Sequence, residues 1–257
     1  NLRAIDTGAF VEVPFDGGRG SALASGRFSY TALLFSALNA STILDYWDYA
    51  GRASYEIAPG QRLSIFGFGA YDHLAEKAEK ADEPDKLLVD TMFHRVAVRY
   101  DVALDAKTRL DYDVVLGWDE TRFDQAREVR DRMLAVKAAV LSRIDDDLEL
   151  VAGMDVTIDE YDVDLARGSA SGFETFFESR ADLAAGLYVV LPWTPLERLA
   201  MRPGVRADLY VSGTDTAFAI DPSVSARLTL APGLSLLTSH GLASQMPSFI
   251  VAGPGFR

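Results

Sequence analysis

The chain has 257 residues, of which 49% are hydrophobic and 11% aromatic, and this composition excludes a disordered protein. The formal net charge of −13 argues against nucleic acid as a partner, and the absence of cysteine excludes disulfide bonds, thiolate metal sites and cysteine nucleophiles. No apolar run reaches the roughly 18 to 20 residues that a membrane helix needs, so this chain could cross a membrane only as strands.

Windows in which apolar and polar side chains alternate recur from one end of the chain to the other. They occupy residues 9–15, 21–30, 45–57, 62–72, 92–101, 108–119, 132–143, 148–159, 181–191, 201–210, 220–230 and 234–242. A period of two is the signature of a β-strand, so the pattern predicts about twelve strands and an all-β fold. Many windows have the length of a tilted membrane-crossing strand, about 9 to 11 residues, rather than the usual 5 or 6 of soluble proteins.

The segment 45–72 shows the pattern most clearly. Apolar and aromatic residues such as Trp47 and Tyr55 fill every second position, and polar residues such as Arg52 fill the positions between them. Pro59 and Gly60 interrupt the alternation, which then resumes. The segment therefore predicts a β-hairpin with one apolar face.

The links between the windows alternate in length. The short ones are 16–20, 58–61, 104–107, 144–147, 192–197 and 231–233, and the long polar ones are 31–44, 73–90, 120–129 and 160–179, with the shorter 211–217 as the weakest member. A soluble sandwich gives no reason for this order, whereas outer-membrane barrels have short periplasmic turns and long extracellular loops. The alternation favours an antiparallel up-and-down transmembrane β-barrel.

Aromatic side chains are expected at the two borders of the membrane, because Trp and Tyr prefer the interface between lipid and water. The candidates near the ends of predicted strands are Tyr30, Trp47, Tyr71, Tyr100, Trp118 and Trp193. Strands are generally rich in aromatic residues, so a purely structural role remains the alternative. Phe66 and Phe68 depart from the pattern, since they fall on the polar side of their strand.

Charged residues of both signs fall on the polar side of the windows. The candidates for a lumen-facing role are Arg52, Arg95, Arg99, Arg109, Asp111, Asp113, Asp155, Arg206, Asp208 and Arg227. In a barrel they would bond to a plug, to one another or to a passing solute. A ladder of cross-strand ion pairs with only a structural role is the alternative.

No cluster of residues points to catalysis, to a metal or to a cofactor. His73, His94 and His240 lie in separate segments and lack the paired spacing of a zinc site. Ser239 and His240 are adjacent in a predicted strand, so their side chains point to opposite faces and cannot act together as nucleophile and base. We therefore expect a protein that is not an enzyme and that has no catalytic residues, no metal site and no cofactor.

Three segments resemble the barrel strands and adjoining loops of TonB-dependent outer-membrane receptors. They are residues 25–30, residues 45–72 and residues 240–249, the last of which contains Gly241, Gln245, Pro247 and Ser248. The resemblance covers most of the chain and consists of the repeated order of strand, turn and strand rather than of catalytic residues. It implies a receptor in the outer membrane of a Gram-negative bacterium that imports a small, unidentified solute with energy delivered through TonB.

The resemblance also implies partners. They are outer-membrane lipid, an N-terminal plug and TonB, and nucleic acid is not among them. The plug and the TonB-engaging motif of the family have no counterpart in this sequence.

If the short links are periplasmic, both ends of the chain would be extracellular. Outer-membrane barrels ordinarily begin and end on the periplasmic side and commonly close with an aromatic residue, whereas this sequence ends in Arg257. We therefore expect residues 1–257 to form a single barrel domain that is an internal section of a larger barrel.

Two other functions remain open at the level of the sequence. A passive porin-like channel or adhesive barrel would have no plug, and a channel would conduct ions without TonB. A soluble all-β binding protein would instead pack its apolar faces against one another. In that case Val114 and Val156 would belong to a packed core, whereas in a barrel they would face lipid.

Overall fold

The protein folds into a single antiparallel β-sheet. The computed structural model describes residues 6–30, 41–78, 80, 82–123, 127–165 and 179–246. In these residues the sheet has 13 strands, in agreement with the all-β, up-and-down architecture that the sequence predicts. Pro247 and Ser248, which carry part of the family resemblance, lie outside the described residues, as do loop residues 31–40 and 166–178.

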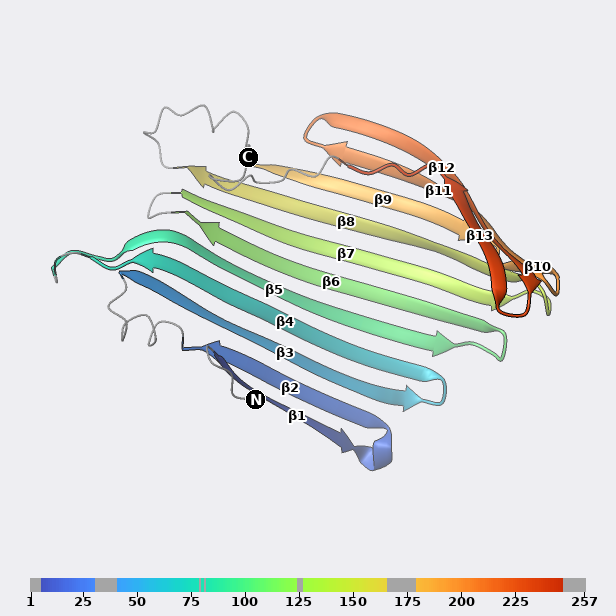
Figure 1. Ribbon diagram of the computed structural model, residues 1–257, viewed down its shortest axis with the longest axis horizontal. Helices are drawn as coiled ribbons and strands as arrows, with labels where there is room; N and C mark the ends of the chain where they lie inside the picture. Colours follow the sequence, from blue (N-terminus) through green and yellow to red (C-terminus); the bar gives the residue numbers. More distant parts are fainter. Residues whose placement is uncertain are drawn as a thin grey trace.

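The strands follow one another along the chain and across the sheet (Figure 1). They are β1 (Asp6–Phe15), β2 (Gly20–Ser29), β3 (Thr42–Ala58), β4 (Gln61–Glu76), β5 (Lys86–Ala103), β6 (Thr108–Arg122), β7 (Arg127–Arg143), β8 (Glu149–Leu165), β9 (Arg180–Val190), β10 (Trp193–Leu196), β11 (Leu199–Ser212), β12 (Asp215–Ala231) and β13 (Leu234–Gly241). The short β10 pairs only with β11 and lies off the main path, which runs from β1 to β13. A 3-10 turn, η1 (Asp16–Gly18), joins β1 to β2.

The sheet has a turn end and a loop end. The turn end, on the right in Figure 1, carries most of the tight links, and Gly60 and Gly233 adopt positive φ values of 75° and 81° there. A turn with proline at its first central residue and positive φ at its second favours glycine at the second, because glycine adopts positive φ without steric cost. The loop end is formed by the opposite ends of the strands, where β4 is followed by β5 and β8 by β9.

Most strands extend further toward the loop end than the alternating windows do. β5 begins at Lys86, β7 begins at Arg127 and β8 continues to Leu165. The links that the sequence suggests at 120–129 and 211–217 therefore shorten to residues 123–126 and to Gly213–Thr214. The backbone ladder continues beyond the point at which one face stops being apolar.

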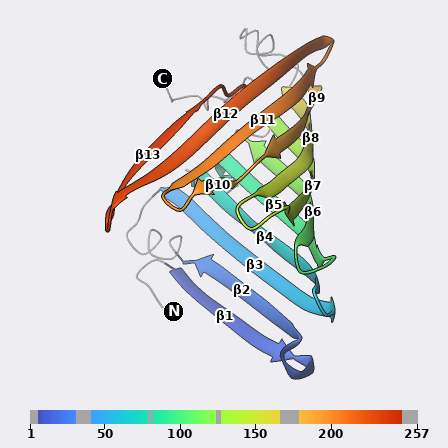
Figure 2. The ribbon, with the colours of Figure 1, turned by 90° about the vertical axis from the view of Figure 1, so that its right-hand side faces the viewer.

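The sheet is a single curved layer, open between its first and last strands (Figure 2). β1 and β13 lie at opposite edges, and no pairing joins them among the described residues. Within the described ranges, each of these two strands is thus hydrogen-bonded to one neighbouring strand only.

Burial in the sheet is the reverse of that in a soluble domain. Ala75 is the one buried hydrophobic residue in the described part of the chain, whereas the buried polar residues include Asp182, Asp208 and Asp221. Large apolar side chains are exposed, among them Leu187 at 63%. The soluble sandwich would pack two apolar faces together, and no second layer covers either face in the described residues.

None of the helices in the described residues is long and apolar enough to cross a membrane.

Candidate functional site

The register of the ladder assigns every strand residue to one of two faces, since residues directly opposite each other in an antiparallel sheet share a face. Asp113 is opposite Arg99 on one side and Lys137 on the other, and Lys137 is opposite Asp155. Following such rows across the sheet places all ten charged candidates on one face, which we call the polar face. They are Arg52, Arg95, Arg99, Arg109, Asp111, Asp113, Asp155, Arg206, Asp208 and Arg227.

The opposite face, which we call the apolar face, carries no charge through its middle. One row across it consists of Ile65, Val98, Val114, Val136, Val156, Ala185, Leu209 and Phe218. The neighbouring row toward the loop end contains Val96, Leu116, Leu134 and Ile158. These rows form a continuous apolar band across the central strands.

Aromatic rings lie at both borders of this band. Toward the loop end, the rings of Trp47 and Tyr71 stack with centroids 5.9 Å apart. Toward the turn end, the rings of Tyr100 and Tyr112 stack at 6.4 Å. Trp118 lies on the same face and is 48% exposed.

The two remaining aromatic candidates lie outside these stacks. Trp193 begins β10 and is opposite Met201, and Tyr30 directly follows the last residue of β2. Trp193 makes no ring-stacking contact with another described residue.

Charged side chains replace apolar ones on this face immediately beyond Trp118. Arg130 lies 2.9 Å from a carboxylate oxygen of Glu128, and its Nε lies 3.8 Å from Glu120. Glu120 also pairs with Arg122. The sequence pattern does not reveal this network, because both faces are polar here and no alternation marks the strands.

On the polar face, Arg95 and Asp119 form a two-pronged ion pair across two strands. The Nη2–Oδ2 distance is 2.7 Å, and Nη1 donates to Oδ1 at 2.5 Å. The guanidinium passes over Gly117, where an ideal Cβ would lie 3.0 Å from its Cζ. A planar guanidinium matched to both carboxylate oxygens is the strongest geometry for such a pair.

Arg206 makes a similar contact nearer the turn end. Its Nη1 and Nη2 donate to the two oxygens of Asp155 at 2.7 and 2.8 Å, and its Nε donates to Asp208 at 2.8 and 2.9 Å. To reach Asp155 on β8, the side chain crosses β9 at Gly186, where an ideal Cβ would lie 2.0 Å from Nη2. Glycine is thus the residue that lets one arginine join carboxylates on two strands.

Arg99, Asp101, Asp111, Asp113 and Arg109 lie toward the turn end, whereas Arg52 lies in the middle of β3. Arg99 donates to Asp101 at 3.0 Å and lies 3.8 Å from Asp113, and Arg109 lies 2.9 Å from Asp111. Arg52 has no ion-pair or hydrogen-bond partner in the part of the chain that the structure describes, and Arg227 reaches only the hydroxyl of Ser235, at 3.4 and 3.5 Å.

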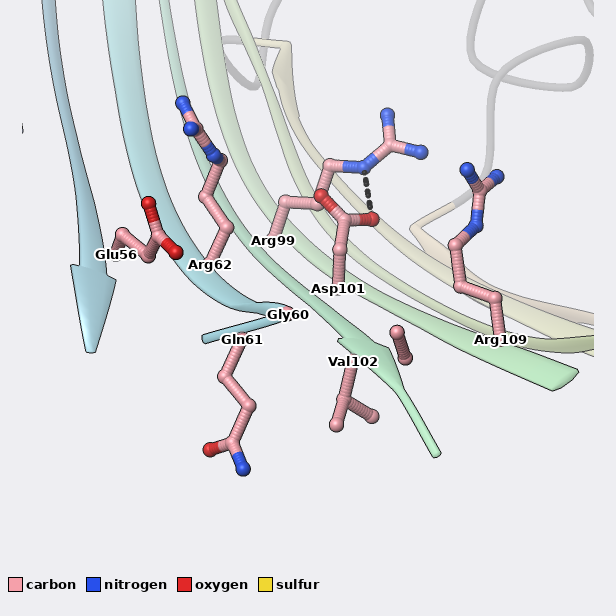
Figure 3. Close-up of a pocket in the computed structure, with 9 residues that line it drawn as sticks. Glu56, Gly60, Gln61, Arg62, Arg99, Asp101, Val102 and Arg109 are labelled. Atoms are coloured by element: carbon pink, nitrogen blue, oxygen red, sulfur yellow. Dashed lines mark hydrogen bonds and ion pairs between the residues drawn. The ribbon is translucent and has the colours of Figure 1, made fainter. Parts of the chain in front are cut away.

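A groove of about 330 Å³ opens on the polar face between β3 and β6. Figure 3 shows Arg62, Arg99 and Arg109 projecting to the same side of the sheet, with Glu56 and Asp101 beside them. Because these arginines lie among carboxylates, the groove presents both signs of charge.

The polar face also carries a cluster of three phenylalanines. The ring of Phe68 lies 5.2 Å from that of Phe66 and 5.9 Å from that of Phe93, the latter pair in an edge-to-face arrangement. The sequence places Phe66 and Phe68 on this side of their strand, and the ladder brings Phe93 to them from β5. The cluster adds an apolar patch to a face that also carries the charged candidates.

The described residues contain no group of three or more His, Asp or Glu side chains arranged to hold a metal ion. His94 instead lies 3.0 Å from the hydroxyl of Tyr49 on the apolar face, and His73 lies 3.7 Å from Asp90.

Comparison with known proteins gives matches of structure but not of sequence. No protein-family model and no curated protein sequence matches the chain. The structure is similar to the siderophore receptor PirA from Pseudomonas aeruginosa, with a TM-score of 0.68 and 12% identity over 95% of this chain and 40% of that one. It is also similar to the FrpB iron transporter from Neisseria meningitidis, with a TM-score of 0.67 and 10% identity over 95% and 46% of the two chains.

A third similar structure is the copper transporter OprC, with a TM-score of 0.66 and 14% identity over 95% of this chain and 47% of that one. The chain spans less than half the length of each of these three proteins. The sheet therefore has the fold of part of a TonB-dependent receptor barrel.

Proposed function

We propose that this chain is part of an outer-membrane receptor barrel that takes up a solute in a TonB-dependent manner. The barrel would lie in the outer membrane of a Gram-negative bacterium, with the turn end in the periplasm and the loop end outside. The solute is a small molecule of unidentified class. The protein would bind and pass this solute without making or breaking covalent bonds.

The observation that carries the proposal is the uncovered apolar band. The row through Val114 and Val156 faces away from the polar side chains and has no second layer over it in the described residues. Such a surface is unfavourable in water, at about 25 cal/mol for each Å² exposed, and favourable against lipid. Aromatic rings at both borders match the preference of Trp and Tyr for membrane interfaces.

The width of the band also fits a membrane. Leu110 and Trp118 bracket it on β6, and both lie on the apolar face. A tilted strand needs about 9 to 11 residues to cross the hydrocarbon layer. The charged network around Glu120 begins where this length ends, as expected for a strand that emerges into the headgroup region.

The polar face would line the interior of the barrel. The two-pronged pairs of Arg95 and Arg206 hold its charges in place, and the phenylalanine cluster offers an apolar contact for a plug or a solute. PirA is described as a siderophore receptor, FrpB as an iron transporter and OprC as a copper transporter. These descriptions guide the choice of solutes to test and do not identify the solute of this chain.

The open edges support an arrangement in which this sheet is one section of a larger barrel. In lipid, an unpaired backbone N–H or C=O costs several kcal/mol, so a spanning sheet must close. The outer edges of β1 and β13 would then pair with further strands of the same barrel. The extent of the structural matches, which leave more than half of each receptor unaccounted for, agrees with this arrangement.

The proposal can be tested in cells that produce the full-length native polypeptide. We expect the protein in the outer-membrane fraction, with an intact mass several-fold above the 28.0 kDa of this chain. Uptake of radiolabelled iron, supplied as ferric siderophores, and of copper would be compared in cells with and without TonB, and in cells that lack the receptor. Uptake that requires both the receptor and TonB would support the proposal.

Other outcomes would support the alternative functions. Ion conductance in planar bilayers without TonB would indicate a passive porin-like channel. A polypeptide that stays dispersed and melts cooperatively without detergent would indicate a soluble all-β protein, and the barrel would be rejected.

A further inference from the structure

A second groove lies on the polar face where β11, β12 and β13 approach the turn end. It has a volume of about 520 Å³ and is lined by Arg202 and Arg227, by serine hydroxyls, and by the small or apolar side chains of Ala200 and Leu237. No acidic side chain lines it. This composition distinguishes it from the groove between β3 and β6, whose arginines lie beside Glu56 and Asp101.

The ladder brings the polar groups of this second groove together. Arg202 on β11 is directly opposite Ser225 on β12, which is directly opposite Ser239 on β13. Arg227 occupies the next row of the same face, opposite Ala200 and Leu237. Arg202 and Arg227 are therefore diagonal neighbours on adjacent strands, within reach of each other for long side chains.

The two arginines are also poorly satisfied. Arg202 makes no hydrogen bond or ion pair within the described ranges, and Arg227 contacts only the neutral hydroxyl of Ser235 at 3.4 and 3.5 Å. Elsewhere on the polar face, Arg95 and Arg206 each hold both oxygens of a carboxylate. A guanidinium offers five N–H donors, so this pair has donors available for a ligand.

We propose that this groove is a binding site for an oxyanion, either a carboxylate or a phosphate. The forked donors of Arg202 and Arg227 would contact the anion, and the hydroxyls of Ser225 and Ser239 would complete its coordination. Guanidinium groups suit these anions because their planar N–H pairs match the spacing of the oxygens. The absence of a competing carboxylate leaves the positive potential of both arginines uncancelled within the groove.

The oxyanion could come from two sources: a dissolved small molecule or a carboxylate of the polypeptide itself. Both make the same contacts with the two arginines. Either source would give the site a role separate from solute transport, and binding at equilibrium requires neither TonB nor a membrane potential. A negative result for oxyanion binding can therefore be distinguished from a negative result for the proposed uptake function.

The test uses the full-length protein in uncharged detergent micelles at constant ionic strength. Inorganic phosphate would be titrated calorimetrically into the wild type, into the double variant Arg202→Gln/Arg227→Gln and into Arg99→Gln. The double variant removes two positive charges from the polar face, and the control removes one, from an arginine already paired with a carboxylate. If the source is dissolved, phosphate affinity should fall at least tenfold in the double variant, as expected for the loss of charged hydrogen bonds, and little in the control.

Thermal unfolding identifies the second source. If a polypeptide carboxylate holds the site, the wild type should not respond to phosphate, and the double variant should unfold at a lower temperature than the wild type in phosphate-free buffer. The proposal is overturned if phosphate binds the wild type and the double variant equally. It is also overturned if phosphate does not bind and the double variant is as stable as the wild type.

Discussion

On the apolar face, Val114 and Val156 contact no second layer, whereas on the polar face Arg95 and Arg206 are each held by both oxygens of a carboxylate. In a soluble domain the valines would be buried and the arginines would reach into water. Here the sheet reverses that order, with Asp208 only 2% exposed and Leu116 55% exposed. The difference shows that carboxylates of the sheet itself satisfy Arg95 and Arg206, whereas no protein layer covers the apolar face in the described residues.

The largest expected effect on stability comes from placing a charge on each face, at two adjacent positions of one strand. Val114→Arg puts a guanidinium in the middle of the apolar band, and we expect it to lower the free energy of unfolding by about 2–4 kcal/mol if that band faces lipid. Val115→Arg puts the same group on the polar face, opposite Ala97 and Ala135. Unfolding of the full-length protein by denaturant in lipid vesicles would measure both.

Val115→Arg is a matched control because the backbone, the strand and the substitution are the same. We expect a much smaller change from it, since a polar interior can solvate the guanidinium. Equal destabilisation by the two variants would contradict the assignment of the faces.

The next effect concerns the glycine beneath Arg206. Gly186→Ala adds a Cβ at a position 2.0 Å from Nη2 and 2.5 Å from Oδ1 of Asp208, so the guanidinium must move away from Asp155. Loss of these charged hydrogen bonds should lower the free energy of unfolding by about 1–3 kcal/mol. Unfolding in vesicles would again be the measurement.

Gly67→Ala is the control for this substitution. Gly67 lies in the middle of a strand on the apolar face, and a Cβ there would make only ordinary contacts, at 3.7 Å or more. Its stability should be unchanged or slightly higher, because alanine is less flexible than glycine in the unfolded chain. If Gly186→Ala behaves in the same way, the Arg206 network contributes little.

The sequence predicts the central part of this architecture well. In the windows 108–119 and 148–159, one face is apolar and the other polar, so alternation reveals both the strands and their faces. The fold class and the about twelve strands that the period predicts agree with the observed sheet, which adds the four-residue β10. The ten charged candidates fall on one face because a period of two fixes the face of every residue once the strand is known.

The loop end was harder to predict for a physical reason. Beyond Trp118, β6 continues through Glu120 and Arg122, where both faces carry polar groups and no alternation remains. The partners of the charged side chains could not be predicted from the sequence either. The contact of Arg206 with Asp155 depends on the register of three strands across Gly186. A pattern within one strand contains no information about that register.

The position where the apolar surroundings end can be tested with Arg132. Its guanidinium lies 5.9 Å from the ring centroid of Trp118 and 3.5 Å from a carboxylate oxygen of Glu160. If this row lies in the wet headgroup region, Arg132→Met should lower the free energy of unfolding by about 0.5–1 kcal/mol, the usual size of an exposed cation–π contact. A stabilised variant would instead show that the hydrocarbon layer extends beyond Trp118.

The smallest expected effect lies in the turn between β5 and β6, outside the apolar band. The Asp105 carboxylate accepts backbone hydrogen bonds from Lys107 at 2.7 Å and Thr108 at 2.8 Å, and these bonds hold the pKa of Asp105 below its usual range. A lowered pKa in the folded state means that the ionised group stabilises the fold above the ordinary carboxyl pKa of about 3.9, and that this stabilisation is lost as the pH falls through the lowered value. The wild type should therefore be slightly more stable than Asp105→Ala at neutral pH, and the difference should shrink in acid.

Denaturant unfolding in vesicles at a series of pH values would measure this difference. Asp146→Ala, in the turn between β7 and β8, is the control, because the Asp146 carboxylate accepts no hydrogen bond in the described residues. Its difference from the wild type should not follow the pH dependence seen at Asp105. A difference between the wild type and Asp105→Ala that stays constant from neutral pH into acid would show that the two backbone bonds do not stabilise the turn. The stability of this turn would then come from the backbone pairing of β5 with β6 and not from the Asp105 side chain.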